Sequence, residues 1–400
     1  MRISSRQYTM NFIHSLQDQQ SKLAKTGEQM ATGKRVITPS DDPVAATRIL
    51  SLRESVGMSE QYGQNGTYVR NRLETEESML ASVTDVLQRT RELTIAAASS
   101  SMSDQDRIST ATEVRARLEH LMGIANSQDA NGEYMFSGSK DVKPFTYNGA
   151  NYIYNGDDTA RELQIGQDFN MIQSDPGSEV FMRITEGNGR FFTDYNPANT
   201  GAGKITGGQI SNVTLLTDHD YTITYNGAPV GNEYSVFDNS LGAALPGPFP
   251  QGSPLVFDGI EVEVGGSPAV GDQYTIEPSS SQSVFATLDR LIKALETPKA
   301  SPSDVAKIAF DMDKSIVDID NALDHILDMR GRIGGRLNTL DGQDYVNEDM
   351  KIQLKSTMSS LEDLDYAEAV GRHDLQLVGL QAAQQTYTRA QGLSLFNYIN

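Results

Sequence analysis

The sequence contains no cysteine among its 400 residues. Disulfide bonds, thiolate metal sites and thiol catalysis are therefore excluded, and the chain can pass between reducing and oxidising compartments without chemical change. No run of about 18 apolar residues occurs, so we expect no membrane-spanning helix. The first residues, MRISSRQ, lack the apolar core of a secretory signal. If the protein is exported, we therefore expect a route without a cleaved signal peptide.

Positive charge is also scarce. Lys and Arg number 33 against 53 Asp and Glu, which gives a formal net charge of −20 at pH 7. This charge repels nucleic acid and anionic membrane surfaces, so we expect neither as a partner. The content of hydrophobic residues, 38%, is nevertheless that of a folded protein.

Proline is almost confined to the middle of the chain. Twelve of the fourteen prolines fall between Pro144 and Pro302, and residues 44–143 and 303–400 contain none. Two proline-free arms around a proline- and glycine-rich middle are typical of helices that enclose an inserted β region. The fold we predict is mainly α, with a long antiparallel helical bundle or coiled coil from both chain ends and a small antiparallel β-sandwich or barrel-like domain.

Residues 309–340 carry the clearest helical pattern. Apolar side chains recur there at alternating spacings of three and four, which is typical of a helix that packs along its whole length. We expect the last helix of the chain to begin near Tyr345. Six aspartates between Asp311 and Asp328 fall between the apolar positions, and we expect them to line a solvated face. The predicted bundle-core residues are Met312, Ile316, Ile319, Leu323, Ile326, Ile333 and Leu337.

Both chain ends have helical patterns with too few large apolar side chains to order an isolated helix in water. Each end therefore needs a partner. The ends could pair with each other in a closed bundle, or they could fold between neighbouring copies; their terminal position favours the second arrangement. The predicted assembly interface comprises Phe12, Ile13, Leu16, Leu23, Met30, Leu361, Leu364, Leu375, Val378 and Ala382.

From Glu133 the pattern alternates, which predicts short strands, the first at residues 134–136, with turns at Asn-Gly pairs and at Gly265-Gly266. We predict three domains with boundaries at these changes of pattern. They are a terminal-helix assembly domain (1–40 with 360–400), a helical-bundle domain with short hairpins (41–174 with 279–359) and an outward β domain (175–278).

Catalytic and ligand-binding patterns are weak throughout. The five histidines are scattered, with no two at metal-ligand spacing, and residues 27–34 fail the phosphate-loop pattern. Gly331, Gly334 and Gly335 indicate close helix packing or a hinge. We therefore predict no catalytic, cofactor-binding or metal-binding residues; an enzyme or binding protein that acts through a polar pocket in the β domain stays as the alternative class.

Two segments resemble the terminal signatures of bacterial flagellin-family axial proteins. They are residues 27–46, which contain GEQMATGKRV and PSDDPVAA, and residues 360–369, SLEDLDYAEA. Within that family, three shorter motifs resemble the members found at the junction of hook and filament. These motifs are MRIS at 1–4, DANGEYMFSG at 129–138 and GDQYTIEP at 271–278.

The resemblance implies a structural subunit of the extracellular flagellum. It implies terminal helices that line the inner core of a tube and assemble with copies of the same chain, between hook-associated protein 1 and flagellin. It also implies export in an unfolded state through the flagellar type III apparatus and a dedicated chaperone on the C-terminal helix. A flagellin-type filament subunit is the alternative, although the ending FNYIN at 396–400 differs from the leucine-rich ending usual in flagellins.

Overall fold

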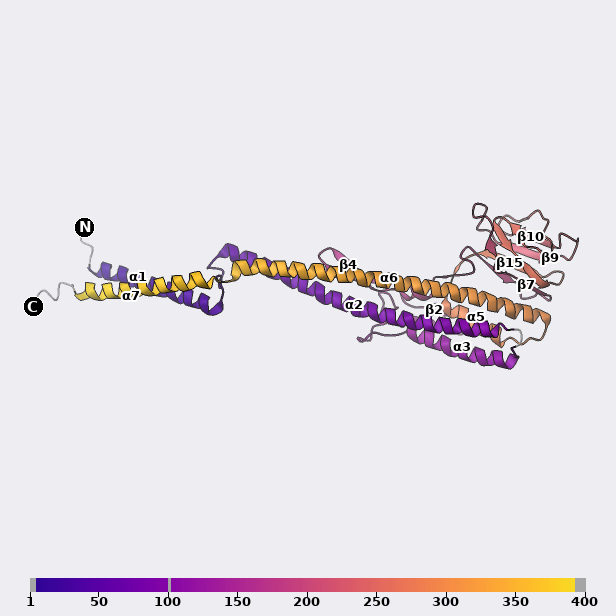
Figure 1. Cartoon of the computed structure of the whole chain (residues 1–400), viewed down its shortest axis with the longest axis horizontal. Coiled ribbons are helices and arrows are strands. Elements are labelled where there is room, and N and C mark those ends of the chain that lie inside the picture. The colour runs from indigo at the N-terminus through magenta and orange to yellow at the C-terminus, as the bar shows by residue number, and fades with distance from the viewer. Residues whose placement is uncertain (1–4, 100–101, 393–400) are drawn as a thin grey trace, which may run out of the picture. The chain divides into compact units, whose positions relative to one another are not determined.

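The computed structural model describes residues 5–99 and 102–392 (Figure 1). Two motifs used in the sequence comparison, at residues 1–4 and 396–400, lie outside the described residues. The described part is mainly α with an inserted antiparallel β domain, which confirms the predicted fold class. The chain divides into two compact units, residues 1–64 with 342–400 and residues 65–341, and each is described by itself.

The described residues contain seven helices, and some of them begin at capping side chains. Ser103 caps one of them by accepting a hydrogen bond from the backbone N–H of Asp106 (3.2 Å), as its spacing indicates. The helices of the described residues are α1 (Ser5–Thr32), α2 (Pro43–Ala97), α3 (Asp104–Ala125), α4 (Gly177–Phe181), α5 (Val284–Glu296), α6 (Pro302–Glu362) and α7 (Tyr366–Gly392).

The prediction that the last helix begins near Tyr345 is wrong. Helix α6 continues without a break to Glu362, and α7 begins at Tyr366. The stop between them has a local cause, because the side chain of Asp365 accepts hydrogen bonds from the backbone N–H groups of Ala367 and Glu368. A carboxylate in this position satisfies the free N–H groups at a helix start, so it favours a new helix there.

Of the two explanations expected for the α6 glycines, close helix packing is wrong, and a hinge stays a prediction. A Cβ atom added at Gly331, Gly334 or Gly335 would meet no atom within 4 Å outside the nearby helix backbone. These glycines therefore leave open space beside α6 and have no close packing to explain them.

We expect Gly334→Ala to raise the free energy of unfolding by about 0.5–1 kcal/mol, because alanine loses less backbone entropy than glycine in a helix. Chemical denaturation followed by circular dichroism would measure the change. Gly33→Ala should have the opposite effect, since Gly33 has a φ of +71° and its added Cβ would lie 3.2 Å from the Tyr366 hydroxyl. A loss of stability in Gly334→Ala would contradict the open environment.

The first unit combines α1 and α7 with the start of α2 and the end of α6. Helices α1 and α7 lie side by side (Figure 1). A small apolar cluster of Val36, Ala45 and Ile49 packs against Met358 and Leu361, so the loop after α1 is attached to both α2 and α6.

The second unit has its main core between the rest of α2, α3, α5 and α6. Phe285 of α5 is fully buried there, with its ring centroid 5.1 Å from that of Phe145 and 5.7 Å from that of Phe181. Two short hairpins lie against this bundle. They are formed by β1 (Phe145–Tyr147) with β2 (Tyr152–Tyr154) and β3 (Arg161–Gly166) with β4 (Phe169–Ser174).

The strand predicted at residues 134–136 is not formed. Met135 and Phe136 are buried as an alternating pattern requires, but the segment makes only one isolated bridge, between Gln128 and Tyr134. The carbonyl of Phe136 instead accepts hydrogen bonds from Gly177 N–H and the Tyr154 hydroxyl. Loop contacts therefore satisfy the backbone groups that a strand partner would need.

The β domain is built from antiparallel pairs around its own core of buried aromatic and aliphatic residues. Its largest sheet has the strand order β11-β10-β9-β15-β6, and Phe310 of α6 joins the core. The strands of this region are β5 (Ile184–Thr185), β6 (Phe191–Tyr195), β7 (Ala202–Ile205), β8 (Gln209–Ile210), β9 (Tyr221–Tyr225), β10 (Tyr234–Asp238), β11 (Ala243–Ala244), β12 (Leu255–Phe257), β13 (Ile260–Val262), β14 (Val264–Ser267), β15 (Gln273–Pro278) and β16 (Ser281–Gln282).

The turn predicted at Gly265-Gly266 is wrong, because both glycines lie within β14 and pair with β7. A Cβ at Gly266 would come within 2.3 Å of the carbonyl oxygen of Ala202. Glycine is therefore required there by the close approach of a neighbouring strand.

Candidate assembly surface

Helix α1 packs against α7 along one seam of side chains. The seam positions alternate in spacing of four and three, which is the pattern of one helix facing another. All of them are buried or half-buried in the structure. The seam consists of Phe12, Leu16, Gln19, Leu23, Thr26 and Met30.

Two contacts fix the direction of the pair. The rings of Phe12 and Tyr387 stack with centroids 5.3 Å apart, and the Thr26 hydroxyl donates to the Gln376 side-chain oxygen at 2.9 Å. The later residue of α1, Thr26, therefore contacts the earlier residue of α7, Gln376. The two helices are antiparallel.

Helix α7 has apolar residues on a buried side and on an exposed side. Its buried side carries Ala369, Gln376 and Leu380, at spacings of seven and four. Leu375 and Val378, by contrast, are 76% and 62% exposed. Large apolar side chains at such exposure, repeated at helical spacing, make this side of α7 a candidate surface for another helix.

The predicted interface residues therefore fall into three groups. Phe12, Leu16, Leu23 and Met30 lie against α7, and Leu361 and Leu364 lie at the break between α6 and α7. The exposed group consists of Ile13, Leu375, Val378 and Ala382.

Sequence reasoning missed two further exposed apolar residues of α7. Val370 and Leu377 are both exposed and lie seven residues apart, on a different side of α7 from Leu375. Their heptad spacing is the signal that could have found them. Together the two pairs widen the apolar surface of α7.

The predicted bundle-core residues lie in the other unit, on α6. Met312, Ile319, Ile326 and Ile333 are buried, and Ile316, Leu323 and Leu337 are half-buried.

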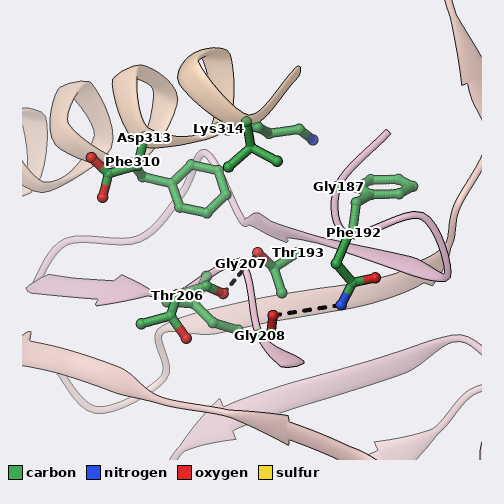
Figure 2. Close-up of a pocket in the computed structure, with 12 residues that line it drawn as sticks. Gly187, Phe192, Thr193, Thr206, Gly207, Gly208, Phe310, Asp313 and Lys314 are labelled. Atoms are coloured by element: carbon green, nitrogen blue, oxygen red, sulfur yellow. Dashed lines mark hydrogen bonds between the residues drawn. The ribbon is translucent and has the colours of Figure 1, made fainter. Parts of the chain in front are cut away.

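A pocket of about 130 Å³ lies where the β domain meets α6 (Figure 2). Phe310 and Lys314 of α6 line it together with Thr193 and Gly208 of the β domain. The Thr193 hydroxyl already donates to the carbonyl of Thr206 at 3.0 Å. This hydroxyl is thus hydrogen-bonded within the protein. The residues that line the pocket include no nucleophile paired with a general base.

The charged side chains of this pocket also have partners. Asp313 is paired with Lys204, and the ammonium of Lys314 lies 4.3 Å from the centroid of the Phe192 ring. The pocket is a mostly apolar recess without the converging polar groups that the alternative class requires.

The prediction that the α6 aspartates line a solvated face is wrong for Asp311 and Asp318. Asp318 is fully buried and accepts hydrogen bonds from the Arg290 guanidinium (3.1 Å) and Gly187 N–H (3.3 Å). Asp311 accepts from the Tyr195 hydroxyl at 3.1 Å. Both differ from the expectation because the polypeptide from Gly187 to Tyr195 covers this side of α6.

We expect Asp311→Asn to stabilise the protein at high pH. Burial raises the pKa of Asp311 to about 6, with a further contribution from the charge of Asp194 and opposing ones from Tyr195, Arg290 and Lys314. Because the pKa of Asp311 is raised in the folded state, protonated Asp311 favours folding. This contribution to the free energy of unfolding is complete below the pKa of the unfolded state and is lost as pH rises through about 6. The gain from the substitution should therefore reach at most about 3 kcal/mol near pH 8 and vanish near pH 4.

Denaturation midpoints across this pH range would measure the effect. Asp324→Asn, at an exposed position on the same helix, is the control and should show no such trend. A stability difference for Asp311→Asn that does not depend on pH would rule out the proposed titration.

Two of the histidines have partners within the protein. His219 Nδ1 lies 2.8 Å from Asp238 Oδ2, and His325 Nε2 lies 2.8 Å from the carbonyl oxygen of Glu179. In the described ranges, no three His, Asp or Glu side chains converge in a way that could hold a metal ion. None of the helices described here is both long and apolar enough to cross a bilayer.

Comparisons with known proteins agree on one family. The model of the bacterial flagellin N-terminal helical region matches residues 3–141. The chain is 27% identical over 398 residues to flagellar hook-associated protein 3 of Escherichia coli (strain K12), with 99% of each chain covered.

Two solved structures from Legionella pneumophila are similar in fold and in sequence. One is flagellar hook-associated protein 3, with a TM-score of 0.74 and 32% identity, over 78% of this chain and 98% of that one. The other is described as the flagellar junction protein FlgL, with a TM-score of 0.69 and 31% identity, over 79% of this chain and 100% of that one.

Proposed function

Because the chain belongs to the family of flagellar hook-associated protein 3, we propose that it is a structural subunit of the bacterial flagellum at the hook–filament junction. It assembles with copies of itself through α1 and α7, and no catalytic role is assigned to it. The one observation that carries this assignment to particular residues is the exposed apolar surface of α7.

The extent of the similarity favours a junction subunit over a flagellin-type filament subunit. The flagellin model matches residues 3–141, whereas the similarity to hook-associated protein 3 extends over 99% of the chain. A junction subunit should not polymerise into long filaments when purified, whereas a flagellin should.

The pairing of α1 with α7 leaves the ends incomplete. A single helix pair buries one seam of each helix, and the apolar side chains of Leu375 and Val378 remain in water. Their burial against helices of neighbouring subunits would stabilise an assembly by roughly 1.5–3 kcal/mol for each side chain fully buried. The ends pair with each other in the structure, and association with other copies through Leu375 and Val378 is what we propose in addition.

The partners that we propose follow from the family. They are copies of this chain, hook-associated protein 1 on the hook side, flagellin on the filament side and an export chaperone that binds α7 before assembly. The protein is extracellular in this proposal and reaches the flagellum through the type III apparatus. We also propose an inner, a middle and an outward part of the subunit, with the domain boundaries predicted from the sequence. These parts are residues 1–40 with 360–400, residues 41–174 with 279–359, and residues 175–278.

We expect the double variant Leu375→Asp/Val378→Asp to fold normally as a monomer but to fail to join the junction. Both side chains are exposed, so the substitutions should change the free energy of unfolding by less than about 0.5 kcal/mol each. Charged groups at a helix interface would prevent burial next to another copy. Swarming and filament growth in a strain that lacks its own copy would measure assembly.

The matched control is Val213→Asp/Leu215→Asp, which changes two side chains of the β domain that are exposed to a similar extent. This variant should support normal filament growth. Normal growth with the α7 variant would refute assembly through α7.

Excision of residues 175–278 addresses the alternative class, since a structural subunit should still assemble and a binding protein would lose its ligand.

A further inference from the structure

The β domain exposes apolar side chains on two turns that lie against each other. The turns are residues 226–232, between β9 and β10, and residues 268–271, between β14 and β15. Gly271 N–H donates to the carbonyl oxygen of Tyr225 at 2.8 Å, which joins the two turns. Val230 is 96% exposed and Val270 is 73% exposed. We call these two turns the tip.

The tip contains no charged side chain, although 22% of the residues in the chain are charged. The acid that follows the first turn, Glu233, accepts hydrogen bonds from Gly231 N–H at 2.8 Å and Gln251 N–H at 3.0 Å. The acid that follows the second turn, Asp272, is buried. Two copies of this chain carry a net charge of −20 each. Because like charges repel, an uncharged surface is a favourable place for two copies to touch.

Hydrogen bonds hold the first turn in one shape. Asn232 N–H donates to the carbonyl oxygen of Pro229 at 3.0 Å. The Asn232 side-chain oxygen in turn accepts from Phe249 N–H at 2.9 Å. A turn that is already ordered loses little conformational entropy when it binds, so Val230 is presented in a form that favours association.

The recess between the β domain and α6 has a matching character (Figure 2). Its volume is about 130 Å³. A dry apolar cavity of about 150 Å³ can hold a benzene ring, so this recess has room for a valine side chain. Phe310 and Val317 of α6 line it, and Val317 is 40% exposed. An apolar side chain that fills such a recess is a common form of strong contact between proteins.

The tip and the recess lie toward different ends of β15. At the start of this strand, Gln273 pairs with Thr224 of β9, next to the tip. Near its end, Glu277 pairs with Phe192, which lines the recess. A copy that places its tip in the recess of a neighbour therefore keeps its own recess open for the next copy. Such a head-to-tail contact can repeat around a ring or along a helix.

We propose that Val230 of one subunit inserts into the recess of a second copy of this chain, so that neighbouring β domains are joined head to tail. The inference rests on the proposed function, because it concerns copies that are already neighbours in the flagellum. The contact is additional to the one made by α7 and is not needed for incorporation. A subunit without residues 175–278 can therefore still assemble.

Disulfide cross-linking in assembled flagella tests the inference, and a chain without cysteine gives a clean background. The double variant Val230→Cys/Val317→Cys is produced in a strain that lacks its own copy, and the isolated flagella are oxidised. A disulfide forms only where two Cα atoms come within about 7 Å. We expect most of the chain to migrate as dimers, trimers and larger species that reduction returns to monomer. Peptide mass spectrometry should show links between positions 230 and 317.

Two variants serve as controls. Val230→Cys/Val305→Cys moves the second cysteine to another position of α6, where the side chain is 45% exposed but does not line the recess. Val230→Cys alone provides only the tip. Neither variant should form the series of cross-linked species, because a head-to-tail contact brings the tip neither to Val305 nor to a second tip.

The possible results separate this inference from the proposed function. Cross-linking of Val230→Cys/Val317→Cys that does not exceed that of the two controls would overturn the inference and leave the function intact. Failure of this variant to enter flagella that do incorporate the unchanged chain would also overturn it, because the contact is not needed for incorporation. Absence of the unchanged chain from flagella would refute the proposed function and the inference with it.

Discussion

Replacing Ile319 with aspartate is expected to lower the free energy of unfolding by several kcal/mol, about 4 or more. The Ile319 side chain is fully buried in the core shared by α2, α3, α5 and α6. A carboxylate there would have to be buried without a partner or take up a proton, and both are costly. The adjacent Asp318 is equally buried, but it is paired with Arg290 at 3.1 Å.

The control for this prediction is Val317→Asp, two residues away on the same helix, where the side chain is 40% exposed. Its effect should be within about 1 kcal/mol. Thermal unfolding, or denaturant unfolding where the protein aggregates on heating, would compare the two variants. Equal effects at the two positions would mean that the apolar seam of α6 does not determine the core.

The long helices could be predicted because their apolar spacing is regular over many turns. Ser103 and the changes at Pro43 and Val284 also have local causes that are visible in the sequence, namely capping side chains and a proline in a first turn. The start of α7 depends on a single aspartate, Asp365, inside an otherwise helical pattern. From helix propensity alone, one aspartate does not outweigh an apolar spacing that continues on both sides of it, so the break is not predicted.

The errors in the β region have a different cause. Phe136 and Gly266 have the burial pattern and the turn composition that the sequence indicates, but their backbone groups bind to segments that are distant in the chain. The same holds for Asp318, whose environment is set by residues from α5 and from the loop around Gly187. Such long-range contacts have no periodic signal in a single sequence.

The candidate assembly surface could be predicted only in part. The spacing of Leu375 and Val378 could be recognised, but not which side of α7 would face α1. The structure places Gln376 against Thr26 of α1 and buries Ala369 and Leu380, but it leaves Leu375 and Val378 exposed. The sequence therefore indicates the presence of an interface, and only the helix pairing shows which residues remain for a second partner.

Replacing Arg336 with methionine is expected to cost about 3–5 kcal/mol at neutral pH, because it leaves a buried charge without its partner. Both nitrogens of the Arg336 guanidinium fork lie 2.8 Å from the carboxylate oxygens of Asp175, whose side chain is 3% exposed. Asp175 N–H in turn donates to Glu76 Oε1 at 3.1 Å, and Glu76 is completely buried. Burial, and then the charge of Asp175, raise the pKa of Glu76.

The pH dependence of this loss follows from the same geometry. Removing the guanidinium takes away a positive charge that lowers the pKa of Glu76, so burial and the charge of Asp175 raise this pKa further, and the folded state binds a proton at Glu76 more tightly than the unfolded state. Stability is then retained at low pH and lost as pH rises, and the cost of Arg336→Met should be smaller near pH 5 than near pH 8. Arg332→Met, which removes a half-exposed partner of Glu179 one turn away, should cost less than about 1 kcal/mol at either pH. Glu76 comes from α2, Asp175 from the segment after β4, and Arg336 from α6. A large loss of stability that becomes smaller at acid pH would show that this ion cluster helps to hold the three elements together. A small loss that does not depend on pH would mean that apolar packing alone holds them.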